Sequence, residues 1–94
     1  MDIKVLRMNT GEEVIFTLIK ENDDCVVVQN ALVAVPSAQG QIGFAPWSVL
    51  SKEEDHIKIE KKYIVYMIDT RDEIVENYKK IFSPIETPSK KLIL

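Results

Sequence analysis

The pattern of hydrophobic and polar positions predicts a chain built mostly of short β-strands. Apolar and polar side chains alternate near the start, and turn-forming residues interrupt the pattern at Asn9-Thr10-Gly11 and Asn22-Asp23-Asp24. Pro46 interrupts the fourth predicted strand or confines it to a sheet edge. The first four predicted strands cover residues of about 3–8, 12–21, 25–35 and 41–45.

The run from Ile57 to Ile68 is the most informative part of this pattern. It predicts a tight hairpin whose return strand, Tyr63 to Ile68, is apolar at every position. Because successive side chains of a strand face opposite sides, such a strand is buried on both faces. A chain of 94 residues has little interior to cover both faces. We therefore expect one face to meet the chain's own core and the other to meet another protein chain.

After residue 70 the apolar period becomes that of a helix. Apolar residues at spacings i, i+1, i+4, i+7 and i+8 predict a helix over about 71–82, which ends before Pro84. The tail, residues 84–94, finishes in Lys-Lys-Leu-Ile-Leu. Two alternatives stay open for it: the tail adds a strand across a subunit boundary, or it packs over its own core.

These elements predict a single mainly β domain over residues 1–94. Short strands in consecutive hairpins, apolar on both faces, favour a small, strongly bent five-stranded antiparallel barrel with a C-terminal α-helix. An open two-layer sheet with the helix on one face is the main alternative.

Composition narrows the setting and the function. The formal charge of −3 argues against a protein coated in basic surface, although a local basic patch remains compatible with it. The single cysteine, Cys25, cannot form an internal disulfide. No apolar run approaches the roughly 20 residues of a membrane span, and the N-terminus lacks the apolar core of a secretion signal. We expect a cytoplasmic protein.

The sequence carries no pattern typical of an enzyme. His56 is the single histidine, so it lacks the partners that a metal or catalytic site would need. We interpret the acidic pairs, such as Glu12-Glu13, as solvated surface residues. Phosphate-binding loops, nucleophile motifs and metal-ligand spacings are absent from the sequence. We expect a protein without catalytic activity, cofactor or metal.

Two short stretches are candidates for contact with a partner. Lys61 and Lys62 lie at the predicted hairpin turn, and a repeated basic turn would attract phosphate in a sequence-independent way, although the adjacent Glu60 cancels part of the charge. Trp47 follows Pro46 in an aromatic segment. It is either a core anchor, which is the interpretation that we favour, or an exposed contact for a partner or a neighbouring subunit.

The residues also carry a family resemblance. The segment Val5 to Val35 resembles the first motif of Sm-like proteins, with its strand, the Gly11 turn, a long second strand and an apolar third strand. Ile64-Val65-Tyr66-Met67 resembles the last strand of the second Sm motif. The element order and the Lys-Lys-Leu-Ile-Leu end are similar to small Sm-like proteins of tailed phages. The resemblance implies an Sm-like (SH3-like) barrel in a homo-oligomeric ring of about five to seven subunits.

The chain departs from the family at the RNA site. It begins in a strand and carries its helix at the C-terminus, and Glu60-Lys61 stands where the family has Arg-Gly. The positions that match the family's Asp, base-stacking aromatic and Asn hold Asn22, Asp24 and Val26. A carboxylate offers no stacking surface. The RNA-binding positions that the resemblance implies are Asn22, Asp24, Glu60, Lys61 and Lys62.

In Sm-like rings, strand edges pair between neighbouring subunits. The interface positions expected from this are Val26, Val28, Ile64, Tyr66 and Ile68. Two functions stay open: a ring that binds single-stranded RNA in RNA regulation, and a protein-interaction or assembly module on the same ring with the RNA site lost. We take the first as the prediction.

Overall fold

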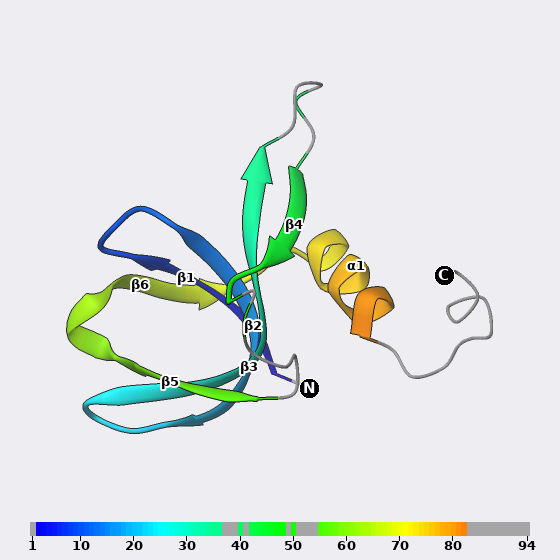
Figure 1. Cartoon of the computed structure of the whole chain (residues 1–94). Coiled ribbons are helices and arrows are strands. Elements are labelled where there is room, and N and C mark those ends of the chain that lie inside the picture. Colours follow the sequence, from blue (N-terminus) through cyan, green and yellow to red (C-terminus); the bar gives the residue numbers. More distant parts are fainter. Residues whose placement is uncertain (1, 37–39, 41, 49, 51–54, 83–94) are drawn as a thin grey trace.

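The computed structural model describes residues 2–36, 40, 42–48, 50 and 55–82, and within them the chain is mainly β with one helix (Figure 1). The elements are β1 (Ile3–Met8), β2 (Glu13–Glu21), β3 (Cys25–Pro36), β4 (Ile42–Pro46), β5 (His56–Glu60), the 3₁₀ turn η1 (Lys61–Tyr63), β6 (Ile64–Asp69) and α1 (Asp72–Phe82). The predicted helix of about 71–82 is confirmed. The tail predictions lie outside the described residues.

All the strands pair antiparallel in one sheet, whose order is β4-β3-β2-β1-β6. The long strand β3 has β2 along one edge. Its other edge is shared, because the first half pairs with β5 and the second half with β4. In the described part of the chain the sheet is open and has six strands. The expected count of five is wrong, because the four strands predicted before residue 46 and the two predicted within residues 57–68 all join the sheet.

The predicted hairpin within residues 57–68 is not formed. The two strands do not pair with each other: β5 pairs with β3, and β6 pairs with β1. The 3₁₀ turn η1 between them changes the chain direction over three residues, so each strand joins a different edge of the bent sheet. Periodicity identified both strands correctly, but periodicity does not report which strand pairs with which.

A β-bulge in β6 explains part of its continuous apolar sequence. Arg7 lies opposite Tyr66 and Met8 lies opposite Ile64, so Val65 is an extra residue in the ladder. The bulge lets Ile64 and Met67, three positions apart, both pack against the core, while the Val65 side chain is 62% exposed. The strand therefore meets its own core with two residues and leaves an apolar side chain in solvent at the bulge.

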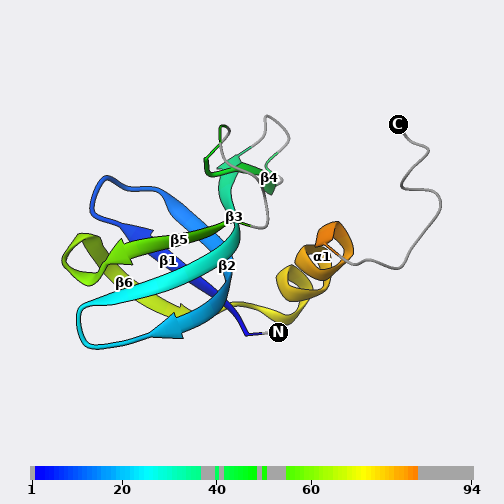
Figure 2. The ribbon, with the colours of Figure 1, turned by 60° about the horizontal axis from the view of Figure 1, so that its bottom comes forward.

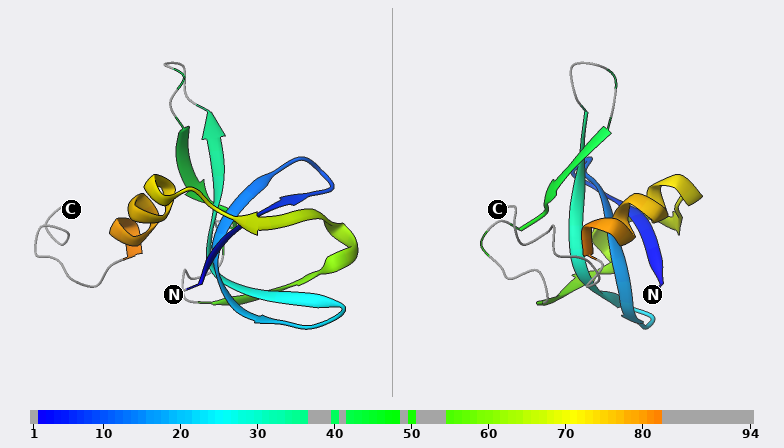
Figure 3. Two further views of the ribbon diagram at one scale, coloured as in Figure 1. Left: turned by 180° about the vertical axis from the view of Figure 1, so that it is seen from behind. Right: turned by 90° about the vertical axis from the view of Figure 1, so that its right-hand side faces the viewer.

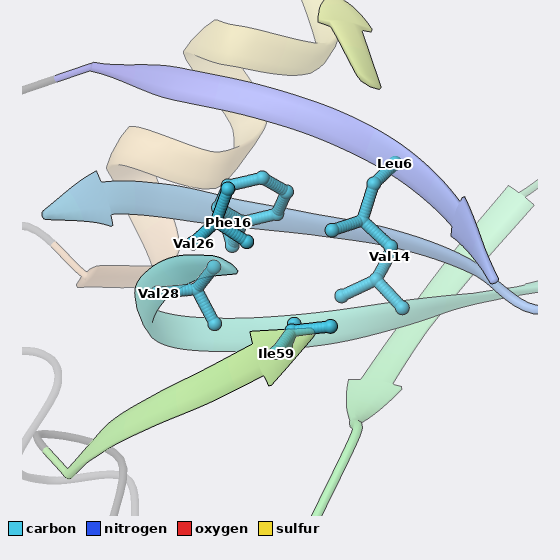
Figure 4. Close-up of a cluster of buried hydrophobic side chains, with 6 residues drawn as sticks. All are labelled: Leu6, Val14, Phe16, Val26, Val28 and Ile59. Atoms are coloured by element: carbon cyan, nitrogen blue, oxygen red, sulfur yellow. The ribbon is translucent and has the colours of Figure 1, made fainter. Parts of the chain in front are cut away.

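The main core lies on the inner face of the bent sheet (Figure 4). Six side chains from β1, β2, β3 and β5 point toward one another and are almost fully buried: Leu6, Val14, Phe16, Val26, Val28 and Ile59. They alternate along the strands with residues that face outward, as the period of two requires. Through this cluster β5, which pairs only with β3 in the described residues, also packs against β1 and β2.

The helix covers a second cluster on the outer face. Ile3, Ile15, Leu32 and Tyr78 are buried there, and Ile74 packs against them from α1. Seen from two further sides, α1 lies at the end of the sheet away from the turns that join β1 to β2, β2 to β3 and β5 to β6 (Figure 3). Both faces of the sheet are therefore covered in part by the chain itself, the inner face by the main core and the outer face by the cluster under α1.

The Tyr78 side chain fastens α1 to a bend in β3. Asn30 adopts a left-handed conformation (φ 56°), which divides β3 into its β5-paired and β4-paired halves. The Tyr78 hydroxyl donates to the Asn30 carbonyl at 2.9 Å and lies 2.8 Å from the Thr17 hydroxyl. Tyr78 thus gives a hydrogen-bonding partner to the buried Thr17 hydroxyl and to the part-buried Asn30 carbonyl. The bend therefore depends on a residue 48 positions away along the chain.

Candidate nucleic-acid interface

Three turns lie together at one end of the sheet, as Figures 1 and 2 show: residues 9–12, residues 22–24 and η1. Two backbone hydrogen bonds join them through η1. The Asn9 amide donates to the Tyr63 carbonyl, and the Lys61 amide donates to the Asp24 carbonyl, each at 2.8 Å. We call this surface the turn end. It brings the sequence-predicted positions Asn22, Asp24, Glu60, Lys61 and Lys62 into one region.

Asn22 is used within its own turn. Its side-chain oxygen accepts from the backbone amides of Asp24 and Cys25, each at 2.9 Å, and its own backbone amide donates to the Cys25 carbonyl. This is the local bonding by which Asn stabilises tight turns. The acceptor side of the Asn22 amide is therefore occupied, and the residue shapes the turn rather than presenting that oxygen to a ligand.

The two lysines differ in their surroundings. The Lys61 ammonium lies 2.9 Å from the Glu21 carboxylate in an ion pair that is partly exposed on both sides. The Lys62 ammonium lies 5.3 Å from the centre of the Tyr63 ring. Tyr63 is 44% exposed. An exposed aromatic ring beside a cation is the pair that the sequence interpretation missed, because Tyr63 was assigned to a buried strand.

The charge of the turn end is negative. Together with the flanking residues Glu21 and Glu60, the turn end carries five carboxylates (Glu12, Glu21, Asp23, Asp24 and Glu60) and two lysines, a balance of −3. A hydrogen bond from the Thr10 hydroxyl lowers the pKa of Glu12, and a smaller contribution comes from a hydrogen bond with Trp47, so Glu12 keeps its charge. Affinity for phosphate at this end thus depends on where the lysines stand, not on the total charge.

A hollow of about 270 Å³ opens beside the Lys61–Glu21 ion pair. Its apolar lining consists of the half-buried Ile64 and Met67 together with the fully buried Val26, and the ion pair forms its polar part. Apolar side chains and an ion pair therefore meet in one hollow next to η1.

The predicted interface residues divide by burial. Val26 and Val28 are fully buried in the main core, so they present no side-chain surface to a neighbour. Ile64 is half-buried against the same core. Ile68 is 52% exposed and keeps an apolar surface. The apolar pattern of β3 comes from its place in the interior of this chain, and the sequence period alone does not separate that place from a subunit boundary.

Tyr66 takes part in a polar cluster on the outer face. Its hydroxyl accepts from Arg7 Nε at 3.1 Å and donates to Glu13 Oε2 at 2.8 Å. The Arg7 guanidinium also donates to the Gly11 carbonyl and lies 3.6 Å from Glu13. Tyr66 is thus held by contacts within its own chain, while Val65, which the sequence did not single out, is the more exposed side chain.

Trp47 is half-buried and packs against the main core. Its backbone amide donates to the Ala31 carbonyl at 3.1 Å, just past the bend of β3. Of the two sequence interpretations, the structure supports the core anchor. The proposed partner contact at Trp47 has only the remaining exposed part of the ring available.

Comparison with protein-family models and with curated protein sequences found no match. Within the described ranges, no helix is long and apolar enough to cross a membrane. In the same ranges, His, Cys, Asp and Glu side chains form no group of three or more that would hold a metal ion.

Proposed function

We propose that the protein is an Sm-like barrel that assembles into a homo-oligomeric ring and contacts single-stranded RNA at its turn end. The observation that carries the ring is that, within the described residues, β5 and β6 each leave one edge open. In the described chain β5 pairs with β3 alone and β6 pairs with β1 alone. Open strand edges of this kind are templates for pairing with another chain.

The order of the strands supports the barrel part of this proposal. Without β4, the sheet reads β6-β1-β2-β3-β5, and the 3₁₀ turn η1 joins its two outermost strands. A sheet whose edges are connected by so short a turn is strongly curved around its inner core. Pairing of β5 from one copy with β6 of the next would satisfy the open edges of these two strands and continue the sheet.

Lys62 and Tyr63 support the RNA part. A base stacks on an aromatic face with about 1–3 kcal/mol, whatever its identity, and an adjacent ammonium attracts phosphate. In a ring each copy contributes one such pair, and several pairs act together. Because five carboxylates lie nearby, we expect modest, sequence-independent binding that weakens steeply as salt rises.

The experiment has two parts. Sedimentation at micromolar concentration measures the mass of the native assembly, and a monodisperse monomer would contradict the ring. Fluorescence anisotropy with labelled oligo-U and oligo-A, titrated with salt, measures the RNA contact. Lys62→Ser and Tyr63→Ser should each weaken binding by roughly tenfold, whereas Lys79→Ser on α1 is the matched control and should leave it unchanged. No binding at low salt would sink the RNA part alone.

A second candidate function is a protein-interaction or assembly module on the same ring. The acidic excess at the turn end and the use of Asn22 within its turn favour it. An assembly that forms in sedimentation but leaves both oligonucleotides free at low salt would support this alternative.

A further inference from the structure

An apolar groove lies on the outer face, between β4, the end of β6 and the start of α1. Its volume is about 200 Å³. The lining is mostly aliphatic, with Ile42, Ile68 and Ile74 among its residues, and it reaches Asp69, Thr70 and Arg71 at the junction of β6 and α1. Ile42 and Ile68 are each 52% exposed, so the chain leaves two isoleucines of this groove uncovered.

Leu50 is the most exposed large apolar side chain of the described residues. It is 96% exposed, which means that its own chain gives it no cover and that it does not occupy its own groove. A single exposed leucine is ordinary on a protein surface. An apolar side chain that protrudes, together with an apolar groove elsewhere on the same chain, is the arrangement from which head-to-tail contacts between copies are built.

Strand direction decides whether the two come together. When β5 of one copy pairs antiparallel with β6 of the next over their full lengths, His56 at the start of β5 lies opposite Asp69 at the end of β6. Leu50 precedes His56 by six positions, a reach of at most about 20 Å. Ile68 and Asp69 are both part of the groove lining. The leucine of one copy therefore lies within reach of the groove of its neighbour.

We infer that Leu50 of each copy inserts into the β4–β6–α1 groove of the adjacent copy and locks the subunits together beyond the strand ladder. This inference rests on the ring of the proposed function. The contact is heterologous, because it uses one surface on each side of the boundary, and it closes when the subunits form a ring. It gives the two exposed isoleucines, Ile42 and Ile68, the cover that they lack in a single chain.

The test compares assembly of the full-length chain with that of three variants. Leu50→Asp should raise the dissociation constant of the assembly at least about tenfold, because it places a charge in an apolar groove. Leu50→Met should stay close to the original. Ile81→Asp is the matched control, since Ile81 is 50% exposed on α1 and lies outside the groove lining; it should leave assembly unchanged. Circular dichroism checks that each variant folds.

A cross-linking experiment fixes the location. In a Cys25→Ala background, Leu50→Cys and Ile68→Cys are combined and treated with a short bis-maleimide. Cross-links between chains in the double variant, absent from both single variants, support the inference. An assembly that forms normally but shows neither cross-links nor sensitivity to Leu50→Asp overturns the inference and leaves the ring intact. A wild-type monomer, or a cross-link within one chain, overturns it as well, and only the monomer also overturns the ring.

Discussion

At the scale of single residues, the Tyr78 hydroxyl has the most consequential place. It donates a hydrogen bond to the Asn30 carbonyl at the bend of β3 and contacts the Thr17 hydroxyl on β2. The ring is fully buried between α1 and the sheet. A buried polar group that loses its partner costs more than the hydrogen bond itself contributed. One oxygen atom therefore couples three elements.

Tyr78→Phe should lower the free energy of unfolding by about 1–3 kcal/mol, because it leaves the Asn30 carbonyl and the Thr17 hydroxyl unpaired. Urea unfolding at neutral pH measures the change. Tyr63→Phe is the control and should stay within about 0.5 kcal/mol, since Tyr63 is at the surface. Equal effects of the two substitutions would show that the hydroxyl at the bend contributes nothing special.

The same residue predicts a loss of stability at alkaline pH. Burial raises the pKa of the Tyr78 hydroxyl above its ordinary value of 10.0, with the hydrogen bond to Thr17 opposing the shift. The folded state therefore holds this proton more tightly than the unfolded state, so the contribution is complete below about pH 10 and falls as pH rises further. Unfolding free energies measured between about pH 8 and 11 should decline more steeply for the wild type than for Tyr78→Phe.

At the scale of elements, the sequence predicted the type and the boundaries of each helix or strand better than it predicted which strands pair with each other. The helix was predictable because the spacing of Ile74, Tyr78 and Phe82 depends only on local geometry. The ladder partners of β5 and β6 were not, because they depend on contacts across the whole sheet. The bulge at Val65 could not be predicted from the sequence either. An apolar residue at every position fits both a strand buried on two faces and a strand with one extra residue.

Val28 and Val65 both belong to the apolar strand pattern, but Val28 is buried in the core and Val65 is exposed at the surface. Val28→Ala should lower the free energy of unfolding by about 2 kcal/mol, because it removes two methyl groups from a side chain with no exposed surface. Val65→Ala should change it by less than about 0.5 kcal/mol. Chemical denaturation of both variants checks the pair, and a small effect at Val28 would contradict its place in the core.

At the scale of the whole molecule, the sequence predicted which residues lie together at the candidate site. It did not predict the contacts that each of them makes. The positions Asn22, Asp24, Glu60, Lys61 and Lys62 do meet at one end. Their individual states depend on three-dimensional neighbours: Glu21 pairs with Lys61, and Asn22 bonds its own turn. The exposed ring of Tyr63 emerged only because η1 turns it away from the interior.

Salt should separate the two activities proposed for the molecule. Assembly through strand edges and apolar side chains is expected to change little between about 0.05 and 0.5 M salt, whereas RNA binding at the turn end should fall by more than tenfold. Sedimentation and anisotropy on the same samples measure both. If the assembly dissociates over the same salt range in which RNA binding is lost, charge pairs hold the subunits together.

The division of β3 at Asn30 also bears on how the molecule comes apart. The first half of β3 supplies a wall of the inner core through Val26 and Val28, and the second half supplies Leu32 to the cluster beneath α1. The two clusters share the strands β1, β2 and β3, and detachment of α1 would expose Ile3, Ile15 and Leu32 on those strands. We therefore expect one cooperative unfolding transition, with no intermediate in which the helix has detached and the sheet stays intact.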